Sequence, residues 1–426
     1  MKKISIFIRN PLFTGSAIVI VGTISINAIN YLYHLMLGRL LGPSGYGELV
    51  ALISLIGLLS IFPSPLNLVV IKYVSSNKDK EQVNNLIRWL RVRVFQFSLL
   101  FFILIILASP FLSSFLHISN ITYLLLIALS FLFSLPAVLN RAILQGFLMF
   151  KQMIYSILIE NIGKFLISIV LVYLGFYLLG AMLALVISAA LGCYLSFIYL
   201  RVNNKVKITR PPLIKKMILF AVPVMIQSFS TTSIFTSDLI LVKHFFSSHE
   251  AGIYASLSTL GKIIFFGASP IATVMFPLIS QKAARGENYK DIFKYSFIIT
   301  LILSLVILTI YWTLPELAII LLYGKAYLEA SYMLVWFGIF ITLFTLSSLL
   351  VNYGLSIGKN RVVLFPLIAS LLQVLLIYLF HESLMMVILI SIFVTALLLA
   401  FLLIYSIYGK RTNTRDKLYI NNSPGI

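Results

Sequence analysis

The sequence has few charged residues, few acids and almost no cysteine, and each shortage excludes a class of protein. Only 10% of its 426 residues are charged and 61% are hydrophobic, a composition that no soluble domain can bury. Its single cysteine, Cys193, excludes an intramolecular disulfide and a thiol-rich metal site. No Ser/His/Asp set, phosphate-binding glycine loop or dinucleotide fingerprint stands in a polar setting, so we predict no enzyme and no bound cofactor.

What the sequence has instead is a series of apolar runs that are long enough to cross a bilayer. They cover about 13–37, 48–72, 94–116, 119–140, 154–175, 178–200, 217–242, 250–277, 294–314, 329–350, 362–380 and 384–408. The first run is too long for the core of a signal peptide, so we interpret it as a span. The predicted fold class is an all-α multi-pass membrane protein with about 12 transmembrane helices.

The net charge of +20 is spread over short loops between these runs and follows the pattern of a topology signal. Every second loop is basic, and together with the termini these loops hold 27 of the 32 basic residues. The opposite side holds Arg39, Lys243 and Lys325, while Lys164 and Lys262 fall inside spans. The positive-inside rule therefore predicts a cytoplasmic (inner or plasma) membrane protein with both termini in the cytoplasm, and no nucleic-acid partner.

An internal repeat organises the chain. The stretch from Gly38 to Leu66 returns 205 positions later, so that Gly47 falls on Gly252 and Pro65 on Pro270. A second echo relates QGFLMFK at 145–151 to YGLSIGK at 353–359, at an offset of 208. Long internal repeats are typical of transporters.

The repeat predicts two lobes of six helices each, joined through a Pro-Pro segment that cannot continue a helix. The predicted divisions are an N-terminal lobe at 1–205, a basic cytoplasmic linker at 206–216 within the link 201–216, a C-terminal lobe at 217–408 and a cytoplasmic tail at 409–426.

Polar side chains inside the spans are the candidates for a substrate cavity, because such groups are costly in lipid. The cavity candidates from the spans are Asn27, Asn30, Glu160, Lys164, Gln227, Thr231, Asp238 and Lys262. Glu160 precedes Lys164 by four residues, the favourable order for an ion pair within a helix. No acid stands at i±3 or i±4 of Lys262, which favours a place in the cavity for that lysine.

Plainer interpretations stay open for the other candidates. The Glu160–Lys164 pair could be structural. Asp238 could neutralise Lys243 or cap a helix at the interface. The Asn and hydroxyl faces could hold helices together. The five histidines form no metal-binding pattern.

Three prolines interrupt the spans at matching depth in the two repeats. Pro63 and Pro65 break the second span and Pro270 breaks the eighth. Each proline removes a backbone hydrogen bond, so the break is either a static kink or the place where a gate helix bends.

Five segments in a fixed order resemble a known family. They are LGRLLGPSGYGELVALISL, LQGFLMFKQ, SDLILVKHFFSSHEAGIYASLSTLGKI, FPLISQKAARGE and LLYGKAYLEAS. Together they resemble the polysaccharide-biosynthesis flippases of oligosaccharide and O-antigen type, within the multidrug/oligosaccharidyl-lipid/polysaccharide exporter superfamily.

The resemblance implies two lobes related by a pseudo-twofold axis along the membrane normal. It also implies that the protein moves a polyprenyl-diphosphate-linked oligosaccharide across the membrane by alternating access, for cell-surface polysaccharide biosynthesis. The cavity positions that match the family are Arg39, Asp238, Lys164 and Lys262. Expected partners are the lipid-linked substrate, the bilayer, a glycan polymerase and other assembly proteins, with the chain itself a monomer. Whether H+ or Na+ drives transport stays open.

Two relatives within the superfamily are the rival interpretations. Peptidoglycan-precursor flippases usually carry two further C-terminal spans, and this sequence shows none after about Tyr408. Multidrug and toxin extrusion pumps carry organic cations and would need acidic cavities, for which only Asp238 and Glu160 are available. The loop after the second span lacks the glycine- and Asp-Arg-containing motif of major-facilitator carriers. A membrane glycan polymerase would need a long outer loop, and this sequence has none.

Overall fold

The computed structural model describes residues 11–76, 79–200 and 214–408. Within these ranges the chain is helical, with no β-strand. The helices are α2 (Pro11–Leu59), α3 (Ser64–Ser76), α4 (Lys80–Phe115), α5 (Thr122–Gly146), α6 (Phe150–Leu171), α7 (Tyr177–Ile198), α8 (Ile214–Phe245), α9 (Ser248–Ala284), α10 (Lys290–Thr313), α11 (Pro315–Leu322), α12 (Ser331–Ser356), α13 (Leu364–Leu379) and α14 (Leu384–Tyr408). The predicted tail at 409–426 and most of the predicted linker at 206–216 lie outside the described residues.

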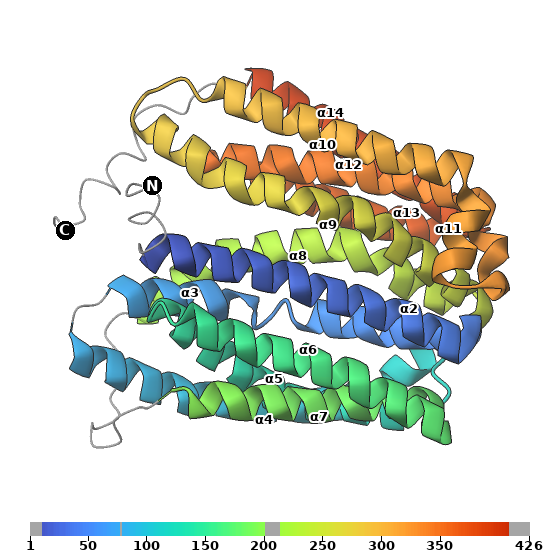
Figure 1. Ribbon diagram of the computed structural model, residues 1–426, viewed down its shortest axis with the longest axis horizontal. Helices are drawn as coiled ribbons and strands as arrows, with labels where there is room; N and C mark the ends of the chain where they lie inside the picture. Colours follow the sequence, from blue (N-terminus) through green and yellow to red (C-terminus); the bar gives the residue numbers. More distant parts are fainter. Residues whose placement is uncertain (1–10, 77–78, 201–213, 409–426) are drawn as a thin grey trace, which may run out of the picture. The chain divides into compact units, whose positions relative to one another are not determined.

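Nine segments of the described chain are long and apolar enough to cross a membrane. One of them holds both α6 and α7, and another holds α2, which is two helices in one. Gly42 has the left-handed backbone (φ 66°, ψ 178°) that separates the two parts of α2, and the chain turns back there (Figure 1). Pro43 then begins the second part, where its missing N–H costs nothing. With α8, a further long helix rich in apolar residues, the predicted number of about twelve helices is reached.

The chain divides into two compact units. The first comprises 1–259 and 316–331, and the second comprises 260–315 and 332–426. In the first unit α5, α6 and α7 lie side by side, with α4 against α5 (Figure 1). In the second unit α13 packs on α14. These units do not coincide with the predicted lobes at 1–205 and 217–408, which stay a prediction.

The helices repeat in order, and one helix end shows the repeat at the level of single hydrogen bonds. Leu148 (φ 60°) and Gly358 (φ 80°) both adopt the left-handed conformation just after α5 and α12. The N–H of Leu148 donates to Gln145 O at 3.0 Å, and the N–H of Gly358 donates to Leu355 O at 3.0 Å. Such bonds satisfy the last carbonyls of a helix. The structural offset here is 210, so the sequence alignment at 208 was wrong by two residues.

Candidate functional site

A close helix crossing in the first unit joins the two copies of the repeated segment. Gly47 on α2 faces Gly252 on α9: a Cβ on Gly47 would lie 2.5 Å from Ser248 O and from Gly252 N. A Cβ on Gly252 would lie 2.5 Å from the carbonyl carbon of Pro43. Ser248 is the repeat counterpart of Pro43, so each glycine meets the other copy's helix start. Only a missing side chain on both helices permits this approach.

A second reciprocal contact lies at the same turn. Arg39 donates from Nε to Leu322 O at 3.1 Å, and from Nη2 to Leu321 O and, at 3.5 Å, to Ile320 O. His244, the repeat counterpart of Arg39, places Nδ1 2.6 Å from the carbonyl oxygen of Phe115, which is the counterpart of Ile320. Both residues thus cap the last carbonyls of a helix, α11 in one copy and α4 in the other. In both contacts each repeat copy meets the same part of the other copy, which defines a local twofold relation at this crossing.

Arg39 and Lys243 both make hydrogen bonds that stabilise helix ends near this crossing. Arg39 is exposed, and the three hydrogen bonds given above go to the end of α11. Lys243 is 1% exposed, and its Nζ donates to His117 O at 3.2 Å and to Ser248 Oγ at 2.8 Å. The sequence placed Lys243 in a loop. It instead lies in the last turn of α8, where a cation is favourable.

Buried hydroxyl groups fill the space beside this crossing. The hydroxyl of Tyr46 lies 2.9 Å from Thr259 Oγ1, 3.0 Å from the hydroxyl of Tyr323 and 3.2 Å from His34 Nδ1. Tyr327 donates to Gly38 O at 2.7 Å. The cluster ties both parts of α2 to α9 and to the segment after α11, which holds this end of the unit together.

Charged groups of α5 and α6 form an ion pair within the helices of the first unit. Arg141 on α5 binds Glu160 on α6 through Nη2, and Arg141 Nε donates to Ser156 Oγ at 2.8 Å. Gly192 on α7 lies against the pair: a Cβ there would collide with Glu160 Oε2 and sit 2.6 Å from Arg141 Nη2. The predicted Glu160–Lys164 ion pair was therefore wrong. Arg141 was missed because it stands at the edge of a hydrophobic run and was counted as a loop residue.

Lys164 has a neutral partner instead of the predicted acid. Its Nζ donates to Asn30 Oδ1 at 2.6 Å and lies 4.6 Å from the centre of the Tyr33 ring. An amide oxygen and an aromatic face both stabilise an ammonium without neutralising it. The network of Arg141, Glu160 and Lys164 thus keeps one net positive charge on helices that span the membrane. Of the predicted cavity residues, it brings together Asn30, Glu160 and Lys164.

The other predicted cavity residues lie apart from this network. Asp238 is buried, and its Oδ2 accepts a hydrogen bond from Tyr254 at 2.7 Å. Gln227 and Thr231 stand on the same helix, half-buried and exposed respectively, and Asn27 is half-buried on α2. Lys262 is half-buried on α9 in the second unit. Their roles in binding stay predictions.

The two predicted helix breaks differ. The second span is interrupted: α2 ends at Leu59, a turn follows, and α3 begins at Ser64. Ser60 and Ser64 satisfy freed carbonyls, donating to Ile56 O and Ile61 O at 2.7 Å. By contrast α9 runs unbroken through Pro270 and Pro277, so a break at Pro270 was wrong. A proline in a helix interior is tolerated where neighbouring helices support it.

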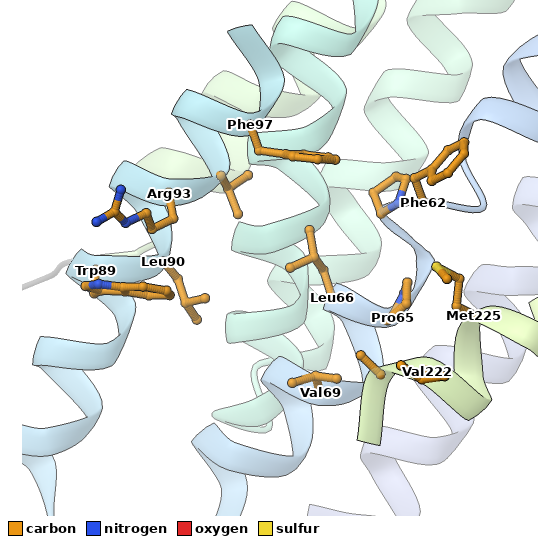
Figure 2. Close-up of a pocket in the computed structure, with 13 residues that line it drawn as sticks. Phe62, Pro65, Leu66, Val69, Trp89, Leu90, Arg93, Phe97, Val222 and Met225 are labelled. Atoms are coloured by element: carbon orange, nitrogen blue, oxygen red, sulfur yellow. The ribbon is translucent and has the colours of Figure 1, made fainter. Parts of the chain in front are cut away.

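An apolar crevice of about 450 Å³ opens beside the break (Figure 2). Pro65, Leu66 and Val69 of α3 line it, and Pro63 and Phe62 line it from the turn. The opposite walls come from α4 and α8, through Trp89, Leu90, Arg93, Val94, Phe97, Ala221, Val222 and Met225. The one charged lining residue, Arg93, turns its guanidinium away from the crevice, donates to Gln96 Oε1 at 2.8 Å and lies over the Trp89 ring. A cation with an aromatic neighbour is typical of the membrane interface.

Comparison with known proteins gives a family and a fold. The family model described as "Polysaccharide biosynthesis protein" matches residues 12–283. An uncharacterized membrane protein of Methanocaldococcus jannaschii is 25% identical over 270 residues, which are 59% of this chain and 63% of that relative, so less than two thirds of the relative is spanned.

Solved structures of one superfamily share the fold at low identity. An inward-facing MATE multidrug transporter superposes with a TM-score of 0.76, at 13% identity over 91% of this chain and 96% of that one. The lipid II flippase MurJ gives 0.72, at 15% identity over 91% and 87%. A transporter of the same superfamily from Pyrococcus furiosus, described as having a binding pocket of reversed polarity, gives 0.63 at 14% identity over 97% and 99%.

Proposed function

Because this chain belongs to the polysaccharide biosynthesis protein family, we propose that it is a flippase for polyprenyl-diphosphate-linked oligosaccharide in the cytoplasmic membrane. The observation that carries the proposal is the net positive charge of Arg141, Glu160 and Lys164 inside the spanning helices. An ammonium at membrane depth costs at least about 2.5–3.5 kcal/mol, so its presence there calls for a function. An anionic diphosphate fits that charge, and an organic cation does not.

The apolar crevice is suited to the lipid part of this proposed substrate. Its walls are apolar side chains of α3, α4 and α8, and it opens among exposed hydrophobic residues such as Phe62 and Val222. An isoprenoid chain is a purely apolar occupant that can enter such a crevice from the bilayer without desolvating a polar group. Movement of the substrate would then proceed by alternating access of the two repeats about the Gly47–Gly252 crossing.

A reconstituted transport assay tests the proposal. The purified chain is placed in liposomes with undecaprenyl diphosphate bearing one fluorescent N-acetylglucosamine, and the outer leaflet is read by a membrane-impermeant quencher. We expect translocation well above that of empty liposomes. Translocation of lipid II alone would favour the peptidoglycan-precursor rival, and expulsion of ethidium alone would favour a multidrug pump.

Lysine substitutions test the charge argument in the same assay. We expect Lys164→Ala to reduce translocation about tenfold or more, while Lys164→Arg keeps part of it because the charge survives. Glu160 keeps its partner Arg141 in both variants, so the amount of folded protein should stay normal. Lys262→Ala and Lys262→Arg serve as the corresponding pair in the second unit. Normal translocation by Lys164→Ala would contradict a role for this charge.

Cysteine labelling tests the proposed orientation. In a Cys193→Ala background, single cysteines at Asn120 and Glu382 should react with an impermeant maleimide added to intact cells, because both lie in loops on the side poor in basic residues. A cysteine at Asn288, in a basic loop, should not react. Labelling at Asn288 alone would invert the topology.

A further inference from the structure

A second cavity lies within the second unit and differs in chemistry from the crevice. It encloses about 430 Å³ between α9, α10 and α12, within the range of small-molecule sites. Six of its twelve lining residues are polar: Ser269, Thr273, Thr300, Thr345, Ser348 and Asn352. The other half is apolar: Phe265, Ala268, Ala272, Phe276, Pro277 and Leu349. None of these twelve residues carries a charge.

The polar groups of this cavity are only partly occupied by the protein. Thr273 and Thr345 donate to carbonyls of their own helices, at 3.0 and 2.7 Å, which leaves the lone pairs of both hydroxyl oxygens available. Asn352 donates from Nδ2 to Ser348 O at 2.9 Å, which leaves its amide oxygen as an acceptor. These groups would accept hydrogen bonds from a ligand in the cavity.

Thr300 brings a buried, unpaired hydroxyl group to the residues that line this cavity. The residue is 1% exposed, and its buried Oγ1 has no hydrogen-bonding partner among the described residues. Leaving a buried hydroxyl unsatisfied costs about 1–3 kcal/mol. A valine would fill the same volume without that cost, so the hydroxyl calls for an explanation.

The chemistry of the lining selects the class of ligand. An anion would find no opposite charge among the lining residues of this cavity, which is unfavourable. A bare cation would fill only a small part of its volume of about 430 Å³, which is in the range of small-molecule sites. A purely apolar chain would leave six polar side chains facing it. We propose that the cavity binds a sugar unit of the transported lipid-linked oligosaccharide, whose hydroxyl groups meet these polar residues and whose C–H faces meet Phe265 and Phe276. This inference rests on the proposed function and assigns it a glycan subsite within the second repeat.

Matched threonines supply the test. Thr300→Val removes the unpaired hydroxyl of a residue that lines the cavity. Thr342→Val removes another buried threonine hydroxyl without a hydrogen-bonding partner among the described residues, on α12 but outside the cavity lining. Both changes remove an unsatisfied hydroxyl and keep the side-chain volume. They should therefore leave folding intact or improve it, and only the first should affect the sugar.

The experiment measures affinity of the full chain in nanodiscs by native mass spectrometry. The probes are undecaprenyl diphosphate without sugar and the same lipid carrying glucose, galactose or N-acetylglucosamine. We expect the wild type to bind at least one sugar-bearing lipid more tightly than the bare lipid. Thr300→Val and Asn352→Leu should reduce that preference at least fivefold with the affinity for bare lipid unchanged, while Thr342→Val keeps it.

The outcomes separate the two proposals. Binding of none of the four lipids by the wild type would overturn the proposed flippase function itself. Tight binding of all four without preference for a sugar would overturn the glycan subsite and leave the flippase standing. A preference that Thr300→Val and Asn352→Leu leave unchanged would place the sugar elsewhere and overturn the subsite as well.

Discussion

The crevice in the first unit and the cavity in the second flank repeat-related helices, yet one is apolar and the other is rich in hydroxyl groups. In the first copy Pro65, Leu66 and Val69 face the crevice. Their counterparts in the second copy are Pro270, Ile271 and Val274, which are equally apolar. In the second copy the cavity is lined by a mostly different set of positions, which includes Ser269 and Thr273. The two copies therefore differ mainly in which face of the helix is left open.

The open face follows from the backbone. In the first copy the helix ends at Leu59 and restarts at Ser64, and the turn between them presents Phe62 and Pro63 to the crevice. In the second copy α9 is continuous, and its face with period 3–4 at 269, 272, 273 and 276 meets α10 and α12. A duplicated sequence has thus produced two open surfaces of different polarity, one apolar and one with six polar side chains, which suits the proposed substrate with its apolar chain and polar head.

The largest effect is expected where both copies meet. Gly252→Ala would drive a methyl group into the backbone of Pro43, which cannot move aside as a flexible side chain would. Overpacking costs typically about 1–3 kcal/mol and more when backbone must shift. We expect a clear loss of thermal stability in detergent and a loss of transport.

Gly57→Ala is the matched control for that change. A Cβ on Gly57 would find Thr236 Cγ2 at 3.8 Å, an ordinary contact, so its melting temperature should stay near that of the wild type. If Gly252→Ala melted like Gly57→Ala, the two copies would not be in close contact at this crossing, and the twofold relation would lose its main support.

A smaller and more selective effect is expected from the prolines. Pro65 lies in the first turn of α3, where it costs nothing, whereas Pro270 lies inside α9, where a proline costs about 3 kcal/mol unless neighbours compensate. Pro270→Ala should therefore raise the melting temperature. Joint replacement of Pro63 and Pro65 by Ala should leave it nearly unchanged but reduce transport about tenfold, because a continuous helix would remove the turn that forms the crevice.

The reverse pattern would break the comparison. If Pro270→Ala abolished transport and the first-copy double variant had no effect, the moving element would be α9, and the interruption at 60–63 would be a static feature. Circular dichroism of both variants checks that helix content rises only in the first-copy variant.

Much of the fold followed from the sequence because it depends on two strong signals. Runs of about twenty apolar residues can form only membrane helices in such a chain, and the repeat offset of 205 pairs Gly47 with Gly252 in the sequence itself. The contact between these two residues was not predicted. A repeat shows which positions correspond, but it does not show which corresponding positions lie at the twofold axis and therefore contact each other.

The site was less predictable because its partners are chosen by packing. Glu160 and Lys164 have favourable spacing, yet Glu160 binds Arg141 from another helix and Lys164 binds Asn30. Spacing along one helix cannot rank such competitors, which depend on helix rotation. One signal was present in the sequence: Gly192 leaves room on α7 beside the pair. The hydroxyl cavity was missed because single Ser and Thr residues in apolar spans resemble ordinary packing positions.

The smallest effect is expected from exchanging polarity between the two surfaces one side chain at a time. Thr273→Val removes a hydroxyl that already donates to Ser269 O, so the ligand loses only an acceptor. Since a typical neutral hydrogen bond contributes about 0.5–1.5 kcal/mol net, affinity for the sugar-bearing lipid should fall about two- to tenfold. Val69→Thr places a hydroxyl in the crevice, but on a helix it can donate to the carbonyl four residues before, so affinity for the bare lipid should fall less.

Titration of each variant with both lipids gives four affinities. The comparison is sharpened if each change weakens only its own part of the substrate, and it breaks if Val69→Thr weakens the sugar preference or Thr273→Val weakens binding of the bare lipid.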